Sequence, residues 1–160
     1  MRENCKFKEI LFETGMGFSA YWFANSVLWI PWKLNNYFGI AVMILLVPVL
    51  WGGVSLFCLK RIHKEQWKVK KYLVAIIFLL IGIVSDYFFF AIWRKIPDEL
   101  YKPTTFAAYG LLFFMPIVVG SFKNYIKNEE SYAISNKNVL CVWIAGIFFL
   151  TMTLFSVKYW

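Results

Sequence analysis

Five long runs of apolar residues, separated by short stretches rich in lysine, form the main pattern along the chain. The runs cover residues 10–31, 38–59, 72–93, 104–122 and 139–157. About 20 apolar residues in a helix cross a hydrocarbon core about 30 Å thick. Isolated strands would leave backbone groups unpaired in lipid, and these runs lack the alternation of a membrane barrel. The pattern therefore predicts an all-α, polytopic integral membrane protein with five transmembrane helices in a single membrane domain, residues 1–160.

The distribution of basic residues tests whether the first run crosses the membrane. This run is the least certain, because polar residues such as Glu13 and Asn25 interrupt it. Lysine and arginine gather in the cytoplasmic loops of membrane proteins. With five spans, twelve of the 17 basic residues lie on one side and five on the other; without the first crossing the division is eight against nine. We therefore expect the N-terminus inside and the C-terminus outside, in a cell membrane of the bacterial cytoplasmic type. A cleaved signal peptide is the alternative for this run, but it has no small-x-small cleavage triplet.

Composition and charge narrow the class of protein further. The chain is 61% hydrophobic and only 16% charged, against about 45–50% and about 25% in soluble domains. This argues against a soluble enzyme, a disordered chain and a secreted disulfide scaffold. The formal net charge is +8, but no stretch outside the apolar runs interleaves arginine with base-stacking aromatics, so no nucleic-acid partner is expected.

Asp86 is the most conspicuous residue within the apolar runs. It lies three to four residues past the middle of the third run, about 5 Å from the midplane toward the outer face. A charge near the bilayer centre costs about 2.5–3.5 kcal/mol. Gly82 lies on the same helical face one turn earlier, which suits close helix packing with the acid turned into the bundle. Two interpretations stay open: a proton, cation or substrate site, and a hydrogen-bonded structural aspartate that fastens helices together.

Glu13 and Asn25 are the other candidates for substrate or ion binding. Glu13 begins a stripe that continues with small residues at i+4, i+7 and i+11, namely Gly17, Ala20 and Ala24. Such a stripe favours a helix-packing surface over a transport path. Asn25 lies on a different face of the same helix, where it can hydrogen-bond across to a neighbouring helix, worth about 0.6 kcal/mol in a membrane.

A basic loop separates the second and third runs. Its cations are Lys60, Arg61, Lys64, Lys68, Lys70 and Lys71. Beside the cytoplasmic leaflet, each gains about 1 kcal/mol from anionic lipid. We expect this loop to lie on anionic membrane lipids, with a lipid-specific or protein-docking role as the alternative.

Acidic residues also lie outside the runs, between the third and fourth. Asp98 and Glu99 follow Pro97 and are flanked by cations. A carboxylate pair there suits acid–base work on a lipid headgroup. The simpler interpretation is a solvated turn whose charges pair among themselves.

The residue inventory argues against most enzyme classes. The chain has one histidine and three cysteines, in no spacing typical of zinc or haem ligation. We therefore expect no metal, no cofactor and no catalytic residues. The resulting hypothesis is a small proton- or cation-linked transporter, or a subunit of a membrane transport complex, with a buried aspartate; it would act as a homo-oligomer or within a larger membrane complex. The alternatives are a membrane enzyme acting on a lipid headgroup at the outer interface and a structural or assembly subunit without a site.

Overall fold

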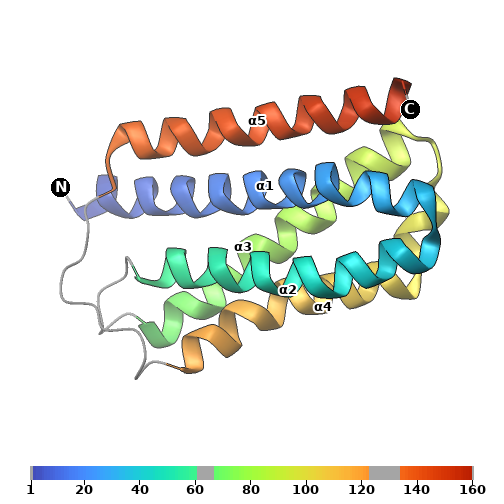
Figure 1. Ribbon diagram of the computed structural model, residues 1–160. Coiled ribbons are helices and arrows are strands. Elements are labelled where there is room, and N and C mark those ends of the chain that lie inside the picture. Colours follow the sequence, from blue (N-terminus) through green and yellow to red (C-terminus); the bar gives the residue numbers. More distant parts are fainter. Residues whose placement is uncertain (1, 61–66, 123–133, 160) are drawn as a thin grey trace. The chain divides into compact units, whose positions relative to one another are not determined.

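A computed structural model of the chain describes residues 2–60, 67–122 and 134–159 (Figure 1). These residues contain helices and no strand, which confirms the all-α prediction. The five α-helices are α1 (Arg2–Leu34), α2 (Asn36–Lys60), α3 (Trp67–Asp86), α4 (Pro103–Ser121) and α5 (Asn136–Tyr159). Each predicted span lies within a helix, except that Phe122 caps the end of α4 and that the third run continues from α3 into a second kind of helix.

Four of these helices are long and apolar enough to cross a membrane: α2, α4, α5, and α3 together with its continuation to Trp93. The chain is therefore a multi-pass membrane protein. In the described residues α1 does not reach the same hydropathy, because the polar residues noted above fall within it. That α1 is a fifth membrane crossing stays a prediction.

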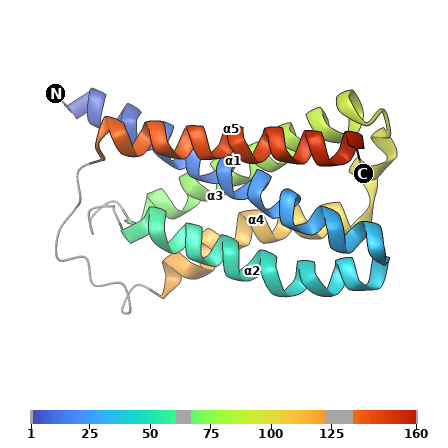
Figure 2. The ribbon, with the colours of Figure 1, turned by 45° about the horizontal axis from the view of Figure 1, so that its top comes forward.

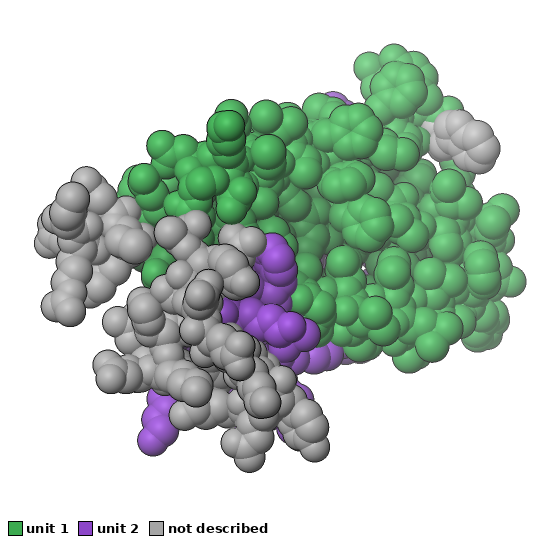
Figure 3. All heavy atoms as spheres, turned by 60° about the vertical axis from the view of Figure 1, so that its left-hand side comes forward, with its two compact units in different colours: residues 1–54, 132–160 green, residues 55–131 purple. Residues whose placement is uncertain are grey.

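The chain divides into two compact units, coloured separately in Figure 3. Unit 1 comprises residues 1–54 and 132–160, and unit 2 comprises residues 55–131. The division falls within α2, between Val54 and Ser55. A single membrane domain stays a prediction.

In unit 1, α1 and α5 lie side by side (Figures 1 and 2). Near the start of the contact, the Trp143 indole nitrogen donates to the Leu11 carbonyl oxygen at 3.2 Å. Farther along, the hydroxyls of Ser26 and Thr153 lie 2.7 Å apart. Residue numbers rise together along both helices, so α1 and α5 run parallel.

A single residue joins α1 to α2. Asn35 lies outside both helices, and its side-chain oxygen accepts a hydrogen bond from the Tyr37 backbone N–H at 2.8 Å. This is the arrangement of an N-cap, which satisfies a donor that the first turn of a helix leaves unpaired. The turn is tight, because a Cβ added at Gly39 would lie 3.0 Å from the Trp32 Cα atom.

In unit 2, α3 and α4 pack antiparallel. The Lys71 ammonium at the start of α3 lies 3.3 Å from the Ser121 hydroxyl oxygen at the end of α4. Gly82, later in α3, lies against Leu112, earlier in α4. The connection between them includes a 3₁₀ helix, η3 (Pro97–Tyr101).

A π-helix, η2 (Tyr87–Trp93), continues directly from α3. Its end shows the wider turn of this helix type, since the Arg94 N–H bonds the Phe89 carbonyl oxygen five residues earlier, at 2.9 Å. π-helices are rare and occur frequently at functional sites. The sequence pattern predicted one continuous α-helical span here and did not reveal the change of helix type.

Candidate functional site

Asp86 pairs with a tyrosine of the neighbouring helix in unit 2. Its side chain is buried, with 8% of its surface exposed. The Tyr109 hydroxyl, from α4, hydrogen-bonds to the Asp86 carboxyl group. A buried polar group without a partner is costly in an apolar environment, so this hydrogen bond helps to stabilise Asp86 at its buried position.

Gly82 allows Tyr109 to approach. A Cβ added at Gly82 would lie 2.5 Å from the Leu112 Cδ1 atom and 3.7 Å from two ring carbons of Tyr109. The absent side chain lets α4 pack closely against α3. Gly82 is one turn before Asp86, so the same close approach brings the tyrosine ring alongside the carboxyl group.

The π-helix begins at the residue after Asp86. In this segment Phe89 is buried, and the Arg94 guanidinium lies 5.8 Å from the Phe89 ring centroid and 5.9 Å from that of Phe90. Cation–π contacts of this kind hold a guanidinium over a ring face. Because α3 ends at Asp86 and the π-helix begins at Tyr87, the buried acid lies where the backbone changes from α to π geometry.

The Asp86–Tyr109 pair has a definite chemical capacity. A carboxyl group in a low-dielectric site can take up a proton, and a phenol can donate a hydrogen bond to it in its ionised form or accept one in its protonated form. The pair can thus hold or release one proton without losing its hydrogen bond. An ionised carboxylate with a phenolic oxygen beside it also offers oxygen ligands to a hard cation.

Tyr109 is the site residue that sequence reasoning missed. Aromatic residues make up 21% of the chain, so a single tyrosine in an apolar run carries no distinguishing signal. The available clue was Gly82, which already indicated a close helix neighbour beside Asp86.

Glu13 lies in unit 1, where it is buried with 3% of its surface exposed. Gly17, Ala20 and Ala24 of the same stripe are also buried. However, α5 packs against other residues of α1, among them Gly15. Two residues turn an α-helix by about 200°, so the predicted stripe lies on the side of α1 opposite to α5. The packing role of the stripe stays a prediction.

Among the described residues, Asn25 makes no cross-helix hydrogen bond of the kind expected of it. Its side-chain nitrogen donates to the Tyr21 carbonyl oxygen of its own helix at 3.0 Å, because this short side chain can reach the carbonyl one turn earlier. The cross-helix contact is made instead by the next residue, Ser26, through the Thr153 hydroxyl. The Ser19 hydroxyl likewise donates to the Val142 carbonyl oxygen on α5, at 2.6 Å.

The predicted basic loop is described only in part. Lys60 ends α2, and Lys68, Lys70 and Lys71 belong to the first turns of α3. Arg61 and Lys64 lie outside the described residues.

The outer acids lie in η3. Glu99 forms an ion pair with Lys102 at 2.7 Å, and its carbonyl oxygen accepts a hydrogen bond from the Thr105 hydroxyl at 2.8 Å. Asp98 is exposed. The arrangement is that of a solvated turn with an internal ion pair.

Within the described ranges, no three histidine, cysteine, aspartate or glutamate residues are grouped to hold a metal ion. Comparisons of the chain with protein-family models, curated proteins and solved structures find no match.

Proposed function

We propose that the protein is a small proton- or cation-linked membrane transporter, or a subunit of a membrane transport complex, in which the Asp86–Tyr109 pair is the protonatable site. The observation that supports this proposal is a buried carboxyl group hydrogen-bonded to a neighbouring helix where α geometry changes to π geometry. Ionisable residues within membrane helices commonly mark ion pathways and proton relays. Two membrane helices with one acid form a small site, which favours a homo-oligomer or a larger membrane complex.

Five membrane crossings belong to this proposal. α5 is apolar enough to span a membrane, and α1 runs parallel to it in unit 1, with contacts from Leu11 through Ser26. Several polar side chains that lower the hydropathy of α1 are buried or bonded: Glu13 is buried, and Ser19 and Asn25 donate to backbone carbonyls. Two parallel spans at the ends of a chain require an odd number of crossings, which agrees with the N-terminus inside and the C-terminus outside a bacterial cytoplasmic membrane.

Reporter fusions at the two termini test this topology. A fluorescent protein that folds only in the cytoplasm should be active at the N-terminus and inactive at the C-terminus, while a periplasmic phosphatase should show the reverse pattern. Both termini reporting the same side would contradict the parallel crossing of α1 and α5.

Proton flux in vesicles tests the site. The purified protein is reconstituted with a pH-sensitive dye, and a potassium gradient with valinomycin supplies the driving potential. We expect Asp86→Asn to abolish protein-dependent proton entry, because the amide cannot take up a proton, and Tyr109→Phe to reduce it. Asp98→Asn is the matched control: it removes the same charge from an exposed position and should leave the flux unchanged.

The alternatives give different results in the same experiments. If Asp86→Asn conducts protons as the unchanged protein does, the pair is not the protonatable site. If the variant accumulates poorly and its melting temperature falls while Tyr109→Phe behaves likewise, the pair is structural, as in an assembly subunit. A sodium gradient imposed without valinomycin, with sodium entry followed by a sodium-sensitive dye, distinguishes a cation-linked from a proton-linked process.

A further inference from the structure

Three helix ends of unit 2 meet at Gly120, far along α3 from Asp86. A Cβ added at Gly120 would lie 2.9 Å from the Lys71 Cβ atom, 3.0 Å from its Cδ atom and 3.5 Å from the Leu59 Cδ1 atom. Leu59 lies at the end of α2, Lys71 near the start of α3, and Gly120 near the end of α4. The aliphatic stem of Lys71 therefore lies directly on the bare backbone of α4.

The Lys71 ammonium is held at a defined position. It lies 3.3 Å from the Ser121 hydroxyl oxygen and 5.2 Å from the Tyr72 ring centroid. The Ser121 hydroxyl donates its own proton to the Ile117 carbonyl oxygen at 2.7 Å, so its oxygen accepts a hydrogen bond from Lys71. An ammonium has three donors, and Ser121 uses one of them.

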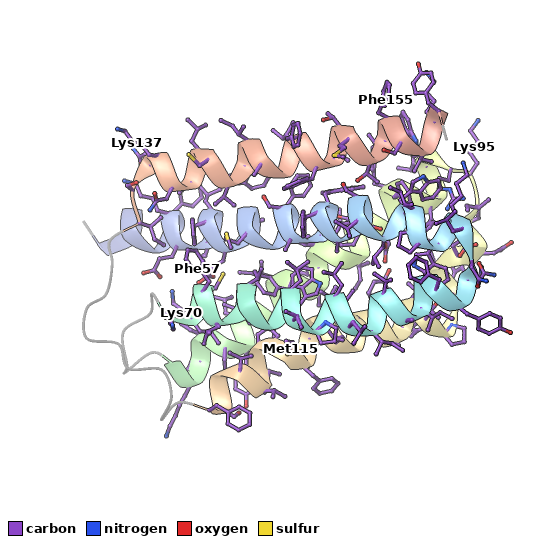
Figure 4. The ribbon with its side chains drawn as sticks, viewed as in Figure 1. Phe57, Lys70, Lys95, Met115, Lys137 and Phe155 are labelled. Carbon is purple, nitrogen blue, oxygen red and sulfur yellow. The ribbon has the colours of Figure 1, made fainter. Side chains whose placement is uncertain are left out.

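The surroundings of this ammonium are strongly cationic. Lys60, Lys68 and Lys70 belong to the same helix ends; Figure 4 shows Lys70 at this end of unit 2 and Lys95 at the other. Among the described residues of unit 2 the acids are Asp86, Asp98 and Glu99. The nearest along the helix, Asp86, is 15 residues from Lys71, or about 22 Å at 1.5 Å per residue. No described acid of unit 2 thus serves as a counterion to Lys71.

We propose that the Lys71 ammonium, positioned by Ser121 and by the close approach of its stem to Gly120, binds the phosphodiester of an anionic phospholipid. The ammonium donates its remaining hydrogen bonds to phosphate oxygens, which strengthens them by charge. Tyr72 and Phe122, which are exposed beside Lys71 and Ser121, contact the upper acyl chains. These apolar neighbours, and the position of Lys71 at the ends of membrane-spanning helices, favour a lipid over a dissolved phosphate. The site is separate from the Asp86–Tyr109 pair and does not depend on the proposed transport.

Native mass spectrometry of the detergent-purified chain tests the site. Phosphatidylglycerol, phosphatidylcholine and inorganic phosphate are titrated separately, and the bound fraction is measured. Lys71→Ala should weaken phosphatidylglycerol binding about tenfold or more, as expected for loss of a hydrogen bond to a charged group. The matched control is Lys68→Ala, which removes the same charge from an exposed side chain and should weaken binding by no more than about fivefold.

Two further variants keep the charge and test the geometry. Gly120→Ala displaces the stem of Lys71, since the new Cβ would lie 2.9 Å from it, and Ser121→Ala removes the hydroxyl that holds the ammonium. Both should weaken phosphatidylglycerol binding while thermal unfolding, followed by circular dichroism, shows a folded protein. They also keep the proposal testable if Lys71→Ala does not accumulate.

Several results would overturn the proposal. Equal losses for Lys71→Ala and Lys68→Ala would mean diffuse attraction to a basic surface. If phosphatidylcholine binds as tightly as phosphatidylglycerol, the site does not select lipids by their net negative charge. Inorganic phosphate that binds as tightly as the lipid would identify a site for a dissolved anion.

Discussion

Replacement of Gly146 by alanine tests the close packing of α5 on α1. Gly146 is buried, and an added Cβ would lie 2.5 Å from the Phe18 Cδ1 atom and 2.9 Å from the Ser19 hydroxyl oxygen. Neither neighbour is free to move: the Phe18 ring stacks on Trp143 with centroids 5.5 Å apart, and the Ser19 hydroxyl donates to the Val142 carbonyl oxygen. The methyl group therefore has to push the helices apart or break one of these contacts.

The size of the effect follows from two opposing contributions. Overpacking a well-filled contact costs about 1–3 kcal/mol, and replacing glycine by alanine in a helix returns up to about 1 kcal/mol of conformational free energy. Gly53 offers a matched control, because it lies in α2 and an added Cβ would meet nothing within 4 Å. The backbone contribution is common to both variants, so their stabilities should differ by about 1–3 kcal/mol, with Gly146→Ala the less stable.

Reversible unfolding in mixed detergent micelles measures this difference. Circular dichroism follows helix loss as the fraction of denaturing detergent rises. Gly53→Ala should unfold at or above the midpoint of the unchanged protein, and Gly146→Ala below it. Coincident unfolding curves for the two variants would refute the packing of Gly146 against Phe18 and Ser19.

Three other outcomes are expected. A double-mutant cycle of Ser26→Ala and Thr153→Val, measured by the same unfolding experiment, should give a coupling free energy of about 0.6 kcal/mol and no more than about 1.7 kcal/mol; zero coupling would contradict the 2.7 Å contact. Asn35→Ala should lower the unfolding free energy by about 1 kcal/mol, because it removes the acceptor for the first turn of α2; an unchanged midpoint would argue against the cap. Replacing both Asp98 and Glu99 by alanine should change stability by less than about 1 kcal/mol and leave proton flux intact, whereas lost turnover of a lipid substrate would favour the enzyme alternative.

Part of the candidate site followed from the sequence. Asp86 stood out because a carboxyl group in an apolar run is costly, and Gly82 marked the face on which a neighbour would pack. The identity of that neighbour did not follow, since any of several aromatic residues in the fourth run satisfied the same pattern. Tyr109 takes the role because the antiparallel register of α3 and α4, with Lys71 near Ser121 and Gly82 near Leu112, brings it level with Asp86.

The first helix likewise followed from the sequence only in part. The sequence predicted a helix over residues 10–31 and a small-residue surface along it, but α5 packs on the opposite side of α1. Both sides carry glycine and other small or hydroxyl residues, so spacing alone does not choose between them. The choice depends on what α5 presents, including Gly146, Trp143 and Thr153.

By itself, the sequence determined that the chain forms long helices suited to a membrane, because apolar runs of about 20 residues must satisfy their backbone hydrogen bonds internally in lipid. It also indicated Asp86 as an acid within the membrane helices, where Asp86 and Glu13 are both buried. The tertiary structure alone decided which residues meet: Tyr109 with Asp86, Ser26 with Thr153, and Lys71 with Gly120. The physical reason is that burial and hydrogen-bond satisfaction act locally along each helix, whereas helix register, pairing and the change to a π-helix after Asp86 depend on the shapes of two surfaces packed together.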